Sequence, residues 1–278
     1  MTSWTVDAPQ RLSFDQPVDR LDAYLVAGRL SVVGTDGPAR VEVTRASRTP
    51  VVVEQRDGRL SVRHDRIPKW PGLLWWLGQL GRRFTVEINI AVPSHAQADL
   101  QMVDGSVVVS GLRQDTRVDV TSGQVTLLGL GGRTSARLVS GPVEALEVDG
   151  DLNMETISGE LILANSAAER VRATTVSGSI TCDLDNPRGS EIRLGTTSGS
   201  VAVRIRQDSD LAVHLQTTSG RITSAFPELR AGAGPAWAKE SRGVLGAGEG
   251  QLWATSTSGN ISLLARPAED DEDVEELP

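Results

Sequence analysis

Three short stretches decide the fold: Val176-Ser177-Gly178-Ser179-Ile180, Thr197-Ser198-Gly199-Ser200-Val201 and Thr218-Ser219-Gly220-Arg221-Ile222. Each places Ser-Gly between β-branched residues. The same dipeptide recurs further along the chain, which indicates an internal repeat. The repeated pairs are Ser122-Gly123, Ser140-Gly141, Ser158-Gly159, Ser177-Gly178, Ser198-Gly199, Ser219-Gly220 and Ser258-Gly259, with Asp104-Gly105 in the equivalent place one step earlier.

The spacing of these glycines predicts a stack of similar units. Successive glycines are 18, 18, 18, 19, 21, 21 and 39 residues apart, and the last interval reads as one 21-residue period plus an 18-residue insertion. Apolar residues alternate before and after each glycine, as in Val171/Ala173 and Ile180/Cys182, which is typical of strands with one buried face. Each period therefore holds two short strands, with Ser-Gly at the corner between them.

The compact arrangement of such units is a flattened coil whose strands pair in parallel with their counterparts in the next coil. We therefore predict an all-β fold, a parallel β-solenoid of 18–21-residue coils. Because parallel crossovers are nearly always right-handed, we expect a right-handed solenoid.

The corner residues have a structural explanation. Glycine adopts positive φ without steric cost, which a sharp corner needs, and a serine hydroxyl can bond backbone groups freed by the turn. The alternative is that the row of serines binds a ligand. A second column, formed by Thr156, Thr175, Thr196 and Thr217, is explained by strand propensity and hydroxyl ladders.

The chain divides into three parts by pattern. Residues 1–103 read as irregular β structure that caps the stack, with strands expected over 21–33, 39–43, 51–55 and 60–63. Residues 104–266 carry the regular coils, interrupted by an insertion over 227–250 that resembles a loop or hairpin. Residues 267–278 form an acidic tail, which we expect to be disordered because like charges repel.

A Trp/Leu-rich segment, residues 69–83, stands apart from the repeats. Tryptophan and leucine beside basic residues suit a membrane interface or a docking surface. A hydrophobic lid over the N-terminal end is the alternative. The candidate contact residues are Trp70, Leu73, Leu74, Trp75, Trp76 and Leu77.

Charge restricts the partners. The net charge is −8, and seven acids lie in the last ten residues, so the body carries 29 acids against 28 bases. A body close to neutral gives no reason to expect nucleic-acid binding. The N-terminal residues lack a secretory signal, so we expect a cytoplasmic protein, with peripheral contact at the inner face of the membrane if residues 70–80 meet lipid.

No pattern in the sequence indicates catalysis, so we predict no catalytic residues, metal or cofactor. His64, His95 and His214 lie far apart in the repeat scheme, and Cys182 falls on an inward position. An acidic patch around Asp149, Asp151 and Glu155, with Glu147 and Glu160 nearby, leaves open a carbohydrate-binding or carbohydrate-cleaving solenoid.

The recurrent Val/Thr-Ser-Gly-x-Val/Ile pattern resembles the bacterial putative-adhesin domain of unknown function, also called the Toastrack domain. The stretch Val86-Glu87-Ile88-Asn89-Ile90-Ala91-Val92-Pro93 is similar to the strand that precedes its repeats, and the likeness covers about residues 18–264. The resemblance implies a β-solenoid with no established catalytic residues and an association with cell-envelope stress systems. We therefore expect a non-enzymatic scaffold that binds a protein partner.

Overall fold

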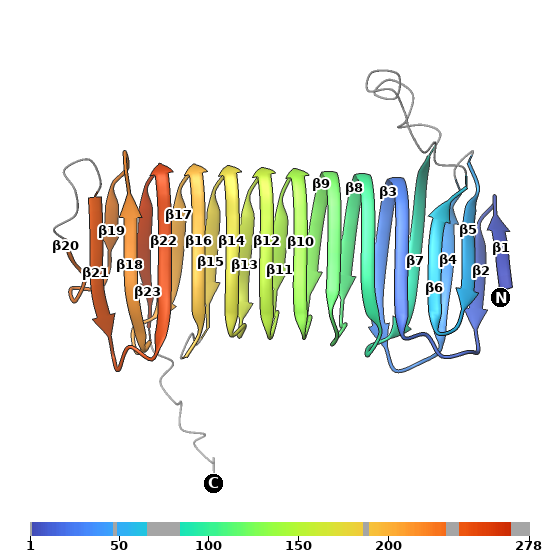
Figure 1. The fold of residues 1–278 in the computed structure, drawn as a ribbon, viewed down its shortest axis with the longest axis horizontal. Coiled ribbons are helices and arrows are strands. Elements are labelled where there is room, and N and C mark those ends of the chain that lie inside the picture. The colour runs from blue at the N-terminus through green and yellow to red at the C-terminus, as the bar shows by residue number, and fades with distance from the viewer. Residues whose placement is uncertain (1, 47–48, 66–83, 186–188, 232–238, 268–278) are drawn as a thin grey trace, which may run out of the picture.

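The computed structural model describes residues 2–46, 49–65, 84–185, 189–231 and 239–267. These residues form an elongated stack of strands, with the N-terminus at one end and β20 and β21 at the other (Figure 1). Within this described part, the chain contains no helix that could span a bilayer. The predicted all-β solenoid is confirmed.

The middle of the stack is built from regular coils, each made of two strands. The strands are β8 (Gln97–Ser110), β9 (Thr116–Leu128), β10 (Arg133–Ser140), β11 (Val143–Leu146), β12 (Asp151–Ser158), β13 (Leu161–Ser166), β14 (Arg170–Ser177), β15 (Ile180–Leu184), β16 (Glu191–Ser198) and β17 (Val201–Arg206). In β8 and β9, one long strand bends at its corner glycine and supplies both halves of its coil.

Two sheets result, and they face each other across a thin apolar interior. Strands that run toward the corner form what we call the entry sheet, and strands that leave it form the exit sheet. Neighbouring coils pair in parallel in both sheets, for example β12 with β14 and β13 with β15. Within β12, Leu152 and Met154 are buried while Asn153 and Glu155 lie on the outer surface. Period-two alternation thus fills one continuous core along the stack.

Glycine is required at the corner because successive backbones approach closely there. A Cβ built on Gly178 would lie 1.8 Å from the carbonyl oxygen of Gly159, far inside van der Waals contact. Equivalent distances of 1.7–2.0 Å occur at every member of what we call the glycine column, namely Gly28, Gly105, Gly123, Gly141, Gly159, Gly178, Gly199, Gly259 and Gly220 in spatial order. Positive φ, the reason expected from the sequence, holds for the first four of these.

The threonine column also differs from its predicted role as a ladder of mutually bonded hydroxyls. Thr196 Oγ1 donates to the carbonyl of Gly178 at 3.1 Å, and Thr217 Oγ1 donates to that of Gly259 at 2.8 Å. Thr175 makes a longer contact of the same kind, 3.4 Å, to Gly159. These buried hydroxyls therefore bond the corner of the neighbouring coil and satisfy carbonyls that the close approach desolvates.

Among the residues that the structure describes, seven strands build the N-terminal end. They are β1 (Thr2–Val6), β2 (Gln10–Phe14), β3 (Arg20–Thr35), β4 (Ala39–Arg45), β5 (Val51–Arg56), β6 (Arg59–His64) and β7 (Thr85–Pro93). The long strand β3 forms a complete coil, and it lies between β8 on one side and β6 with β7 on the other (Figure 1). Beyond it, β5 with β1 and β4 with β2 continue the two sheets in antiparallel order.

The C-terminal end departs from the order that the glycine spacing predicted. Its strands are β18 (Leu211–Thr217), β19 (Ile222–Ser224), β20 (Arg230–Ala231), β21 (Lys239–Leu245), β22 (Gly250–Ser258) and β23 (Ile261–Arg266). The last coil, β22 with β23, lies between the β16–β17 coil and the β18–β19 coil rather than beyond it (Figure 1). The insertion places β21 antiparallel on the outer edge of β18. The short strand β20 then pairs antiparallel with β21 at Arg242 and Ser241 and covers part of this edge.

Replacing Gly178 with alanine tests the close approach at the corner. Because the methyl group would overlap the Gly159 carbonyl, we expect the free energy of unfolding to fall by about 3 kcal/mol, measured by urea denaturation. Gly195 in the adjacent coil is a matched control, since its Cβ would meet only Thr255 Oγ1 at 3.5 Å. Equal losses for Gly178→Ala and Gly195→Ala would contradict the steric explanation.

Candidate interaction surface

The outer surface of the entry sheet carries most of the charged side chains that the repeats hold in register. Arginines on this surface form ion pairs with carboxylates. Two pairs join residues two positions apart on one strand, Arg117 with Asp119 (2.7 Å) and Arg193 with Glu191 (2.5 Å). Two others join neighbouring strands, Arg137 with Glu155 (3.2 Å) and Arg170 with Asp151 (2.6 Å). These exposed pairs contribute little stability each. The pairs do hold the long arginine side chains in regular positions along the sheet.

A shallow groove of about 710 Å³ runs along this surface beside the corner. Its apolar wall includes Tyr24, Val139 and Ile157, which are 40%, 46% and 53% exposed. Arg137 and Arg172 border the groove on the side away from the corner. Val139, Ile157 and Val176 occupy the same position in three successive coils. The first two line the groove, and Val176 continues the exposed apolar row by one coil beyond it.

An exposed tryptophan continues the surface toward the C-terminal end. Trp253 on β22 is 45% exposed and stands in register between Arg193 and His214. The Arg193 guanidinium lies 5.1 Å from the centroid of the Trp253 ring, and the His214 ring packs against it at 72°. His214 Nε2 is 2.8 Å from Glu240 Oε1. His214 thus faces outward, as predicted, but it is held between two partners.

The predicted acidic patch does not assemble as one cluster. Asp151 and Glu155 lie on the entry sheet, whereas Glu147 and Asp149 lie at the opposite edge, between β11 and β12. Glu160, just past the corner, accepts a hydrogen bond from Ser179. Within the described residues, no group of three or more His, Cys, Asp or Glu side chains could hold a metal ion.

Ion pairing also fixes the protonation of the two entry-sheet acids. A two-point hydrogen bond from Arg170 lowers the pKa of Asp151. Hydrogen bonds from Asn153 and Arg137 lower the pKa of Glu155. Both carboxyl groups are therefore ionised at neutral pH, and neither is suited to act as the general acid of a glycosidase.

The predicted corner serines form an exposed row along one edge of the solenoid. Register pairs Ser122 with Ser140, Ser140 with Ser158, and so on through Ser177 and Ser198 to Ser258. The remaining pair, Ser219-Gly220, lies at the end of this row, where Gly220 packs on Gly259. These serines border the apolar edge of the groove, and a role for them in ligand binding stays a prediction.

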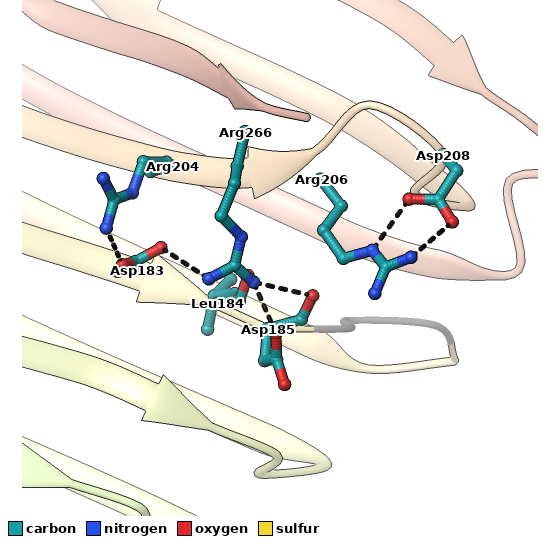
Figure 2. A network of polar contacts seen from close by, with 7 residues as sticks. All are labelled: Asp183, Leu184, Asp185, Arg204, Arg206, Asp208 and Arg266. Atoms are coloured by element: carbon teal, nitrogen blue, oxygen red, sulfur yellow. Dashed lines mark hydrogen bonds and ion pairs between the residues drawn. The ribbon is translucent and has the colours of Figure 1, made fainter. Parts of the chain in front are cut away.

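A polar network secures the inserted last coil on the exit sheet (Figure 2). Arg266, at the end of β23, reaches Asp185 Oδ1 at 2.5 Å and Asp183 Oδ1 at 3.9 Å. It also donates to the backbone carbonyl of Leu184. Arg204 donates to Asp183 from the intervening strand β17, which lowers the pKa of that carboxyl. Arg266 therefore connects β23 with the end of β15, two coils away.

Two groups that could carry chemistry are buried in the core. His64, at the end of β6, accepts the Val26 N–H through Nδ1 at 3.2 Å, and burial lowers its pKa to about 4. Cys182 lies inside the stack, as predicted, and burial raises the pKa of its thiol. His95, by contrast, is exposed beside Asp19.

The Trp/Leu-rich candidates Trp70, Leu73, Leu74, Trp75, Trp76 and Leu77 lie outside the described residues. A membrane contact through them stays a prediction. Sequence reasoning missed Tyr24, Arg193 and Trp253 as surface features. Their outward position in register with neighbouring coils was the signal that could have found them.

The geometry defines a class: a two-sheet parallel β-solenoid with a glycine corner and a grooved, arginine-rich outer sheet. The family model described as Toastrack DUF4097 matches residues 34–264, and the chain belongs to this family. No curated protein matches the chain.

The solved structures that match this chain are distant in sequence. A putative adhesin from Bacteroides fragilis is 13% identical with a TM-score of 0.51, and the match covers 92% of this chain and 97% of that chain. A putative cell adhesion protein from Clostridium sporogenes is 10% identical with a TM-score of 0.28, covering 93% of this chain and 100% of that chain. At such identities the likeness to the Bacteroides fragilis protein shows the fold.

Replacing Asp183 with asparagine tests the network that holds the last coil. Loss of the charge-assisted bonds should lower the free energy of unfolding by about 1–2 kcal/mol at neutral pH. Because the folded-state pKa is lowered, this contribution is complete above the unfolded pKa near 3.9 and is lost as pH falls through the folded value. Urea titrations across this range should show the difference from the natural chain narrowing below about pH 4. Asp119→Asn, at an exposed pair, should cost little, and a deficit for Asp183→Asn that persists in acid would count against the network.

The thiol of Cys182 should be unreactive in the native protein. Thiolate is the reacting form, and both burial and the raised pKa suppress it. We expect a thiol reagent at pH 8 to label the chain only after denaturant is added, as mass spectrometry would show. Rapid labelling of the native protein would mean that the interior opens.

Proposed function

We propose that this protein is a non-enzymatic interaction module that presents the outer surface of its entry sheet to a protein partner. The proposal rests on the groove described above. Its apolar edge includes Val139 and Ile157 and lies beside arginines that the strand register holds in regular positions on the solenoid. The description of the Bacteroides fragilis structure as a putative adhesin supports a binding role.

The residues on this surface favour a protein as the partner. Tyrosine, tryptophan and arginine are enriched at protein interfaces and at the positions that dominate binding energy. Tyr24 and Trp253 supply exposed rings at the two ends of the surface, and the intervening coils supply arginines already fixed by their partners. Because the solenoid is rigid, ordering its surface on binding costs little conformational entropy.

The carbohydrate alternative has less support. The two entry-sheet acids are ion-paired and ionised, which removes the general acid that cleavage needs. The Arg193 guanidinium lies over the Trp253 ring and the His214 ring packs against it at 72°, so part of the surface on which a sugar would stack is already in contact with the protein. We propose the cell envelope, with which the family resemblance implies an association, as the compartment in which to look for the partner.

Substitution on each sheet tests the proposal. Ile157→Lys places a charge on the groove edge, whereas Leu264→Lys makes the matched change on the exit sheet, where the leucine is 48% exposed. Tagged natural and variant chains would be crosslinked in native bacterial extract and their partners identified. We expect a protein that the natural chain and Leu264→Lys retain to be lost, by about tenfold or more, from Ile157→Lys.

Circular dichroism would establish that both variants keep the natural fold. Retention that is unchanged in Ile157→Lys, or that is lost in Leu264→Lys instead, would refute the entry sheet as the binding surface. Retention of lipid in place of protein would assign the interaction to the membrane.

A further inference from the structure

Both sheets of the solenoid end at the same level at the N-terminal end of the stack. In the entry sheet β6, β5 and β1 follow β3, and in the exit sheet β7, β4 and β2 follow it (Figure 1). The outermost strands, β1 and β2, each pair on one side only among the described residues. Backbone N–H and C=O groups on their outer edges are therefore available to a further strand in each sheet.

These two edges lack the features that usually keep edge strands from pairing, namely lysine, proline, bulges and inward-pointing charges. The sequence of β1 is Thr2-Ser3-Trp4-Thr5-Val6 and that of β2 is Gln10-Arg11-Leu12-Ser13-Phe14, in which Arg11 is the single charged residue. Trp4 packs edge-on against Phe14, with ring centroids 5.2 Å apart, but it is only partly buried. A further layer of strands would complete its burial.

The opposite end of the stack has a different form. There β20 pairs with part of the outer edge of β21, and Phe226 is buried in the turn that precedes β20. In the entry sheet β21 and β20 extend beyond β18, whereas within the described residues the exit sheet stops at the three-residue strand β19. The two sheets are therefore not flush at this end, and a second copy cannot pair with both of them at once. The surface that matches the N-terminal end of one copy is the N-terminal end of another.

The two N-terminal edges are complementary to themselves about a single two-fold axis. Trp4, the middle residue of β1, lies four residues before Ala8, and Leu12, the middle residue of β2, lies four residues after it. Because Ala8 lies at the corner between the strands, both middle residues lie at about the same height. An axis perpendicular to the sheets at this height sets β1 antiparallel to β1 of a second copy and β2 antiparallel to its β2. All five residues of each strand then have a partner.

This register brings compatible side chains together. Inward residues lie opposite inward residues, which a shift of one position would prevent, so the apolar core continues across the junction. On the outer surface, Ser3 lies opposite Thr5 of the second copy, and Arg11 lies opposite its Ser13. Like charges therefore do not face each other in either sheet.

We propose that two copies of this chain join end to end through β1 and β2 and form a rod in which both sheets continue across a two-fold axis. Because the axis is perpendicular to the sheets, the two entry sheets face the same way. The dimer therefore presents the candidate interaction surface twice on one side of the rod, and a partner with two binding sites gains affinity from engaging both.

The size of the end face sets the strength of the contact. It measures about 17 Å along the strands and about 10 Å between the sheets. This is small beside the area of about 800 Å² that each partner buries in a standard interface. We therefore expect a reversible dimer with a dissociation constant of about 10–100 μM.

Ser13 provides a matched test because it lies opposite Arg11 of the second copy. Ser13→Glu should tighten the dimer by about tenfold and Ser13→Lys should weaken it by a similar factor, since each dimer contains this contact twice. Ser31→Lys, at an outward position inside the stack, is the control for added charge. Sedimentation velocity of the full chain over about 5–500 μM gives the dissociation constant, and small-angle X-ray scattering gives the length of the dimer. Within its own copy Ser13 lies opposite Arg40, so melting curves of the dilute monomer separate changes in folding from changes in association.

A concentration-dependent dimer about twice as long as the single chain, with opposite shifts for the two Ser13 variants, supports the proposal. A chain that stays monomeric up to about 500 μM overturns it, and another segment of the chain or another protein is then the occupant of these edges. A dimer no longer than the single chain, or equal weakening by Ser13→Lys and Ser31→Lys, places the contact elsewhere and overturns it as well.

Discussion

The distance between successive backbones at the corner is the constraint on which the rest of the structure depends. Each glycine of the column lies so near a backbone carbonyl of the neighbouring coil that no side chain fits between them; that carbonyl belongs to Val86 for Gly28 and to another column glycine for the rest. This contact brings the two sheets to a common edge and keeps the coils in identical register. In the later coils the threonine or serine at the adjoining inward position donates to a corner carbonyl, as Thr196, Ser256 and Thr217 do, whereas the buried Thr156 hydroxyl has no partner among the described residues.

Because the corner fixes the register of the strands, it also fixes which residues point inward and build the core and which point outward and can serve another purpose. Inward residues must be apolar and of limited volume, because two sheets enclose a single thin core. Outward residues face no such demand. On the entry sheet they nevertheless form ordered rows of arginine, carboxylate and aromatic side chains. The features specific to this protein therefore lie on the outer surface of the solenoid and not in its apolar interior.

The architecture could be predicted from the sequence because one repeat unit carries it. Inward columns such as Val171 and Ala173, the corner at Ser177-Gly178 and the burial of Cys182 all follow from period and residue type. The order of the coils at the ends could not be predicted in this way. The spacing between glycines gives the length of a coil. It does not say which coils lie next to each other, because that depends on which sheet edges are still unpaired, as the positions of β3 and β22 show. The groove was missed because register across coils, not distance along the chain, brings its residues together.

The placement of the last coil has a consequence for synthesis on the ribosome. In most repeat proteins, structure can grow by adding each new unit to the one before. Here the layer next to β16 and β17 is supplied by the final strands, after β18, β19 and β21 have already emerged. Until β22 emerges, β18 therefore either lacks its parallel neighbour or pairs with β16 and is later displaced from it. The stack closes only when β23 is released, so folding during synthesis leaves this layer open until the last strand of the solenoid has emerged.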